Sequence, residues 1–148
     1  MVESLRFLHL ISVMVYFGLP FTFGRWWRTA ANDPGSPAFG LCLMRIRNFS
    51  LVHLNLAGGM GGLTGLGLAF TVYPNRMPVW IPLAFVLWLA SLVNLNAILL
   101  PRLKAVMSND PADPKGVTAL TRGMAVFSGL HHTLVTALVA LMVFKPVW

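Results

Sequence analysis

Residues 48–72 read NFSLVHLNLAGGMGGLTGLGLAFTV and contain no charged residue. An α-helix needs about 20 mainly apolar residues to cross a hydrocarbon core of roughly 30 Å, and this stretch is longer than that. It also lacks the strict apolar/polar alternation of a strand in an outer-membrane barrel. The sequence therefore predicts a transmembrane helix over residues 48–72.

Three further stretches without charge, residues 7–24, 77–101 and 123–144, lie on either side of this segment. The whole chain is 57% hydrophobic and only 10% charged, whereas a soluble domain is typically about a quarter charged. In lipid a helix satisfies its own backbone hydrogen bonds, so each stretch can span alone. We therefore expect an all-α fold with one membrane domain over residues 1–148. It would be a four-transmembrane-helix bundle, with helices near 5–24, 48–72, 78–101 and 121–144.

The formal net charge of +7 comes from basic residues between the apolar stretches. This placement argues against a nucleic-acid partner, which would need a basic face. Eight basic residues follow the first or the third predicted helix: Arg25, Arg28, Arg45, Arg47, Arg102, Lys104, Lys115 and Arg122. The other three are Arg6, Arg76 and Lys145. Because basic residues favour the cytoplasmic side, we expect both termini on the opposite side of the membrane.

Four histidines are the ionisable side chains that these spans place in the membrane: His9, His53, His131 and His132. An ionisable residue inside a membrane is a candidate functional residue by default. At about 1.5 Å of rise per residue, His53, Asn94 and His131 fall at similar depths, roughly 9 to 13 Å from the cytoplasmic basic residues. His9 falls in the opposite leaflet.

Histidines on facing helices can supply axial ligands to a haem iron. The pattern predicts a b-type haem, with His53 and His131 as candidate metal ligands and Asn94 beside them. His132 points about 100° away from His131, so both are not expected on the same ion. Copper, which binds imidazole and thioether groups, is an alternative. A further alternative is a chain without a cofactor, whose histidines bond neighbouring hydroxyl or carbonyl groups.

Six glycines crowd one stretch of the second predicted helix: Gly58, Gly59, Gly61, Gly62, Gly65 and Gly67. The pairs Gly58/Gly62 and Gly61/Gly65 have the GxxxG spacing that permits close helix approach. This face predicts tight helix packing or a slot for a flat macrocycle. It could equally contact another membrane chain or a second copy, as in a structural accessory subunit of a larger complex.

Signs of a catalytic site are lacking. The single cysteine, Cys42, excludes a CxxC motif, and no serine lies in a Gly-x-Ser-x-Gly turn. The interiors of the spans hold no acid that could orient a histidine. Trp80 and Trp88 are interpreted as aromatics at the interface or facing lipid. We therefore predict no catalytic site in this chain.

Several short segments resemble small bacterial four-helix membrane proteins. They are LRFLHLIS at residues 5–12, the following Tyr16-Phe17-Gly18, NLNAILLPRL at residues 94–103, and the end of the last helix at residues 140–146. The group comprises HemJ-type protoporphyrinogen oxidases, copper-resistance D (CopD) proteins and uncharacterised relatives. The resemblance implies a bacterial cytoplasmic (inner) membrane protein.

In HemJ-type enzymes a first-helix histidine is associated with haem, and His9 matches that position. The CopD likeness implies copper handling or transport. HemJ-type enzymes also use a lysine in the third helix. Here the first lysine is Lys104, and the corresponding region reads WIPLA at residues 80–84. Protoporphyrinogen oxidation is therefore not expected.

Overall fold

The computed structural model describes residues 2–30, 33, 36–108 and 114–145. Helix α1 covers Val2–Ala30, and α6 covers Pro114–Phe144. Between them run two segmented helices. The first joins α2 (Pro37–Asn48), η1 (Phe49–Leu54) and α3 (Asn55–Val72), and the second joins α4 (Trp80–Val93), η2 (Asn94–Leu99) and α5 (Leu100–Ser108). The described residues contain no strand, and the predicted all-α four-helix bundle is confirmed.

The helices extend beyond the predicted spans, most of all in the second one. This helix starts at Pro37 instead of residue 48. Ser36 caps it, because its Oγ accepts a hydrogen bond of 3.2 Å from the Phe39 amide, and Pro37 has the fixed φ that suits a first helical position. Most of the expected connection over residues 25–47 is therefore helical. Charged residues end a membrane span, but they do not end a helix.

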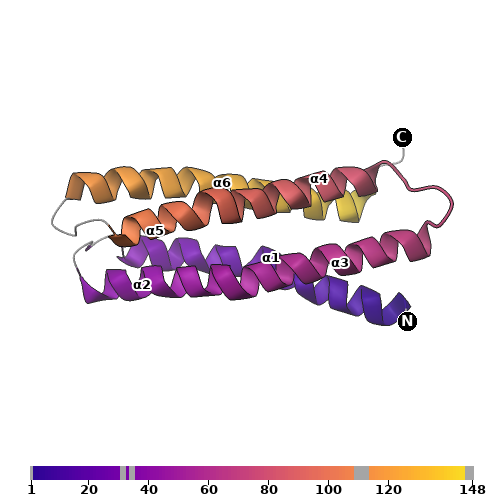
Figure 1. The fold of residues 1–148 in the computed structure, drawn as a ribbon, viewed down its shortest axis with the longest axis horizontal. Helices are drawn as coiled ribbons and strands as arrows, with labels where there is room; N and C mark the ends of the chain where they lie inside the picture. The colour runs from indigo at the N-terminus through magenta and orange to yellow at the C-terminus, as the bar shows by residue number, and fades with distance from the viewer. Residues whose placement is uncertain (1, 31–32, 34–35, 109–113, 146–148) are drawn as a thin grey trace.

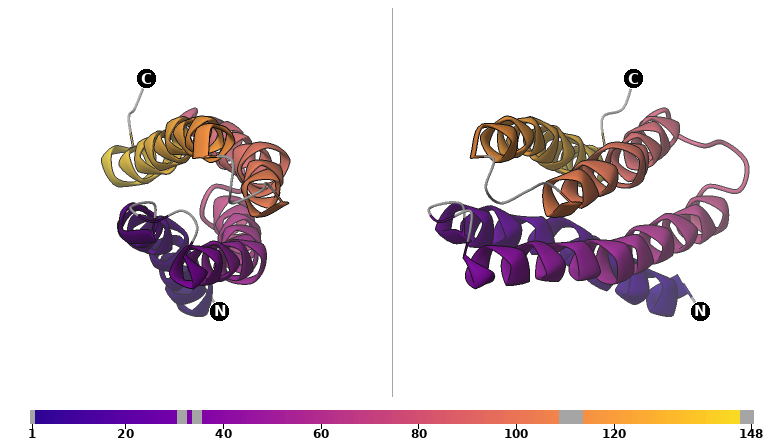
Figure 2. Two further views of the ribbon diagram at one scale, coloured as in Figure 1. Left: turned by 90° about the vertical axis from the view of Figure 1, so that its left-hand side faces the viewer. Right: turned by 60° about the vertical axis from the view of Figure 1, so that its left-hand side comes forward.

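The four helices lie side by side in two pairs. Helix α1 packs mainly against α3, and α4 packs mainly against α6. Figure 2 shows these pairs facing each other across the bundle. The start of α1, the end of α3, the start of α4 and the end of α6 meet at one end of the bundle, which we call the terminal end (Figure 1).

Three helices among the described residues are long and apolar enough to cross a membrane: Val2–Gly24, Trp80–Ser108 and Arg122–Phe144. The helix over residues 37–72 is not among them, and glycine, which contributes little hydropathy, recurs along it. Large apolar side chains cover the outside of all four helices, as they do in lipid: Phe7, Met14, Phe21, Leu63, Phe70, Val86, Leu89, Val126 and Val143. The surface therefore fits a bilayer environment.

The packed interior occupies the middle of the bundle and the end opposite the terminal end. At that opposite end, Phe39, Leu43, Ile46, Leu103, Val106 and Met124 form one buried cluster. Tyr16, Leu54, Ala57, Leu95 and Val135 form a second cluster nearer the middle. At the terminal end, by contrast, α1, α3, α4 and α6 line a cavity.

The glycines of α3 receive side chains from this chain's own helices. A Cβ at Gly58 would lie 2.8 Å from the Tyr16 ring, and a Cβ at Gly65 would lie 2.9 Å from the His9 ring. A Cβ at Gly62 would overlap the Trp88 ring. Trp88 therefore faces inward, which corrects its interpretation as an interface or lipid-facing residue. Side chains of this chain thus cover three of the glycines that could have contacted another membrane chain.

Two π-helical segments, η1 and η2, interrupt the two middle helices. Asn55 follows η1 and Asn96 lies within η2, and their amides bond each other reciprocally at 3.1 and 2.8 Å. Asn55 also donates to the Leu51 carbonyl, and Asn96 donates to the Leu92 carbonyl. Such segments often mark functional sites in α-helices. Here the Asn55–Asn96 pair connects the two π-helical segments, η1 and η2, across the bundle.

We predict that Gly62→Ala destabilises the bundle, because the new methyl group displaces the Trp88 ring. The free energy of unfolding should fall by about 1–3 kcal/mol, which is typical of overpacking. Gly59→Ala is the matched control, since nothing lies within 4 Å of its Cβ position. That variant should be unchanged or up to about 1 kcal/mol more stable. Denaturant titration of both variants in detergent, followed by circular dichroism, checks this, and equal stability would contradict it.

Candidate functional site

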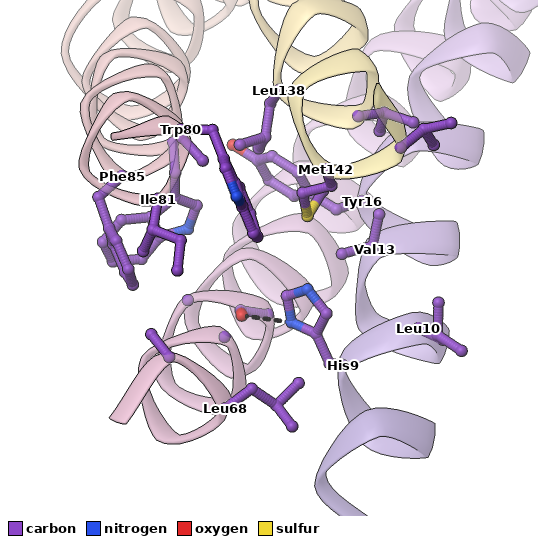
Figure 3. A pocket seen from close by; sticks show the side chains of 18 of the residues that line it. His9, Leu10, Val13, Tyr16, Leu68, Trp80, Ile81, Phe85, Leu138 and Met142 are labelled. Carbon is purple, nitrogen blue, oxygen red and sulfur yellow. Dashed lines mark hydrogen bonds between the residues drawn. The ribbon is translucent and has the colours of Figure 1, made fainter. Parts of the chain in front are cut away.

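A cavity of about 400 Å³ lies at the terminal end, between α1, α3, α4 and α6. Figure 3 shows its side chains converging from these helices. The α3 wall consists largely of backbone, because four glycines line it: Gly58, Gly61, Gly62 and Gly65. Aromatic rings line other parts, including Tyr16, Tyr73, Trp80, Phe85 and Trp88. The volume and the mainly apolar lining are typical of a site for a small molecule or cofactor.

His9 lies on the glycine wall with a fixed tautomer. Its Nδ1 is 2.9 Å from the Gly61 carbonyl oxygen, which can only accept a hydrogen bond. Nδ1 therefore carries the proton, and in the neutral ring Nε2 keeps its lone pair. Thr64 Oγ1, which donates to the Met60 carbonyl, lies 3.3 Å from the same Nδ1. Figure 3 shows the second ring nitrogen turned into the pocket.

Arg6 and Lys145 are the charged residues that line the pocket, and both are cationic. Arg6 lies one turn before His9, on the side of the terminal end. It pairs with Glu3 at 2.8 Å, but both side chains are solvent-exposed, so the pair contributes little to stability. The lining is therefore mainly apolar, with two cations toward the terminal end, of which Arg6 is paired with the exposed Glu3.

A second polar region lies deeper in the bundle, behind Tyr16. Ser91 Oγ donates to the Trp88 carbonyl, so the Tyr16 hydroxyl donates to Ser91 over 2.9 Å. The ring of His131 meets the Tyr16 ring edge-on, with centroids 5.5 Å apart. Asn94 Nδ2 donates to the Phe127 carbonyl, one turn before His131.

His131 and Asn94 are 2% and 3% exposed. Within the described part of the chain, neither ring nitrogen of His131 nor Asn94 Oδ1 completes a hydrogen bond of standard geometry, although the imidazole also faces the backbone of Ser91. Buried polar atoms of this kind are uncommon and reduce stability. The structure thus brings these two predicted residues together, in a closed region with no bonded partner for the imidazole.

The structure does not bring His53 and His131 together. His53 is exposed on the outside of η1, where its ring stacks on Phe49 with centroids 4.7 Å apart. His132 Nδ1 donates to the Ser128 carbonyl at 2.7 Å, and its ring meets Phe21. The predicted pairing of His53 with His131 as metal ligands therefore has no geometric basis. The described residues also hold no group of three or more His, Cys, Asp and Glu side chains that could bind a metal.

Sequence reasoning named His9 and the glycines of the α3 wall, but it did not place them in one pocket and it missed the charged lining residues Arg6 and Lys145. Arg6 and His9 are three residues apart and so share a helix face, which was a usable signal. Lys145 had no such signal, because its part in the pocket depends on where the end of α6 packs.

Comparisons with protein families, curated proteins and solved structures found no match to this chain. The site is therefore interpreted from its own geometry.

We predict that His131→Leu leaves the free energy of unfolding within about 1 kcal/mol of wild type or raises it, because no hydrogen bond is lost. Tyr16→Phe is the control. It removes the bond to Ser91 and should cost about 1 kcal/mol. Equilibrium unfolding in detergent measures both. A loss of about 2 kcal/mol or more in His131→Leu would mean that the imidazole has a bonded partner in the folded protein.

Proposed function

We propose that the protein binds a b-type haem in the terminal-end pocket, with His9 as an axial ligand. One observation carries this proposal. The Nδ1–H of His9 is bonded to a backbone carbonyl, while the opposite ring nitrogen faces a cavity floored by glycine. Metal-ligating histidines usually donate their second N–H to a carbonyl or carboxylate, which fixes the ring and raises its basicity. His9 already has this arrangement.

The choice of haem over a bare metal ion follows from the number of ligands. A porphyrin supplies the in-plane ligands, so the protein needs only one or two axial side chains. A site made of protein ligands alone needs more, and the described residues offer no cluster of three His, Cys, Asp or Glu side chains. A copper site of imidazole and thioether groups stays the alternative, which metal analysis distinguishes from haem. The HemJ-like sequence around His9 independently suggests the same ligand.

The shape of the pocket also suits a flat, apolar molecule. The rings of Tyr16, Trp88 and His9 cover three of the four glycines that line the α3 wall, so a planar molecule would lie against these rings. The tryptophans of α4 supply further apolar surface. Haem b also carries propionate carboxylates at one edge. Arg6 and Lys145 at the mouth could bind them, while their aliphatic stems lie along the apolar lining.

We further infer that the protein lies in the bacterial cytoplasmic membrane with the terminal end facing the periplasm. Eight of its basic residues lie near the other end of the bundle, as expected for a cytoplasmic face. A haem at the terminal end would then be close to one membrane surface. That position suits electron exchange with a partner protein there, without a catalytic site in this chain.

We predict that the purified full-length protein in detergent binds ferric haem in a 1:1 ratio with a sharp Soret band. His9→Ala should weaken binding at least tenfold and shift the band, because the axial nitrogen is lost. The matched control is His53→Ala, since that ring lies on the outside of the bundle. It should bind haem like the wild type. Absorption titration measures both variants, and elemental analysis of the native preparation tests for iron and copper.

His9→Gly with added imidazole separates ligation from folding. Free imidazole should restore the band if the only lost function is the axial ligand. A stable wild-type protein that stays colourless with haem would contradict the proposal and favour a structural accessory subunit. Equal weakening by His53→Ala and His9→Ala would place the haem elsewhere.

We predict that the positive mouth of the pocket recognises carboxylates. Arg6→Gln and Lys145→Gln should together weaken haem binding several-fold, because two charge-assisted interactions are lost. The same double variant should bind the dimethyl ester of haem as well as the wild type does. The control is Lys104→Gln, a change near the opposite end of the bundle. If the double substitution weakened binding of the ester as much as that of haem, these residues would act through structure and not through charge.

A further inference from the structure

We propose that Met142 is the second axial ligand, so that the pocket holds haem between an imidazole on α1 and a thioether on α6. This inference rests on the haem proposal above and adds a coordinating residue to it. Met142 lines the cavity, and Figure 3 shows its sulfur on the side of the pocket opposite the ring of His9. Histidine with methionine is an established axial pair for haem iron.

The position of Met142 along α6 supports the pairing. The rings of Tyr16 and His131 touch, so they give a common reference level on α1 and α6. His9 is seven residues from Tyr16, or roughly 10 Å, toward the terminal end. Met142 is eleven residues from His131, or roughly 16 Å, in the same direction. Counted from this side-chain contact, His9 and Met142 therefore differ in level by roughly 6 Å.

The lean of the side chains leaves this difference unchanged, because Tyr16 leans with His9 on α1 and His131 leans with Met142 on α6. Side chains on a helix lean toward its N-terminus. The N-terminus of α1 is at the terminal end, whereas that of α6 is at the other end of the bundle. The His9 ring thus leans outward and the Met142 side chain leans inward. An axial pair therefore requires the flexible thioether of Met142 to close the rest of the distance.

The same register brings a cation next to each ligand. Arg6 precedes His9 by three residues, and Lys145 follows Met142 by three. Because α1 and α6 run in opposite directions, each cation lies one turn closer to the terminal end than its ligand. On both α1 and α6 the proposed iron ligand therefore lies deeper in the bundle than the cation that neighbours it. This order matches a haem whose iron is deep in the pocket and whose carboxylates lie at the terminal end.

Other possible ligands in the pocket are already engaged or less suitably placed. The Tyr16 hydroxyl donates to Ser91, within the buried cluster. Tyr73 lies after the end of α3 and packs edge-on against Trp80, with centroids 6.3 Å apart. The pocket lining includes no cysteine and no second histidine. Met142 is thus the soft ligand that remains.

The test compares the haem-loaded wild type with Met142→Leu, a change that keeps volume and apolar character. Wild-type ferric protein should be low-spin and show the far-red charge-transfer band of a sulfur–iron bond. Met142→Leu should lose this band, become high-spin and have a lower reduction potential, while the Soret band remains. Met142→His should return the protein to a low-spin state with the spectrum of two histidine ligands. The control is Met60→Leu, an exposed residue of α3 outside the pocket.

The outcomes separate the two proposals. This inference would be overturned if the charge-transfer band were absent in the wild type or unchanged in Met142→Leu. If the Soret band still depended on His9, the haem proposal would stay intact. Failure of the wild type to bind haem would overturn both. Loss of the band in Met60→Leu as well would show that the spectrum reports general packing, which would also overturn the assignment.

Discussion

The bundle depends on one face of α3 that carries no side chains. Tyr16 and His9 from α1 and Trp88 from α4 all lie against glycines of this face. The bare face also exposes carbonyl oxygens whose second lone pair is unused by the helix. Trp88 Nε1 donates to the Gly58 carbonyl at 2.9 Å, and His9 donates to the Gly61 carbonyl. The glycines thus supply hydrogen-bond acceptors as well as space.

This arrangement matters because apolar burial cannot drive helix association in lipid. The two helix pairs are instead joined by polar contacts that cross the bundle. Trp88 reaches the backbone of α3, Tyr16 reaches Ser91, and the amides of Asn55 and Asn96 bond each other. These contacts lie near the middle of the bundle. Toward the terminal end His9 and Leu5 still cover Gly65 and Gly67, and the pocket lies between these residues and the side chains of α4 and α6.

Much of the fold could be predicted from the distribution of charge. The gaps between charged residues gave the number of helices and their order, because a charge is costly in lipid. The direction of each side chain around its helix could not be obtained in this way. His53 and His131 have similar calculated depths, yet one is exposed and the other is buried. Depth follows from the rise per residue, whereas direction also depends on packing and on the π turn that contains His53.

The most buried histidine is not the one that borders the cavity. His131 is enclosed by packed side chains, so a large cofactor could reach it only by displacing them, whereas His9 borders an existing cavity. The two residues are nevertheless connected through Tyr16, which lines the pocket on one side and meets the His131 ring on the other. Tyr16 is therefore the side chain through which the pocket and the buried His131 imidazole are in contact.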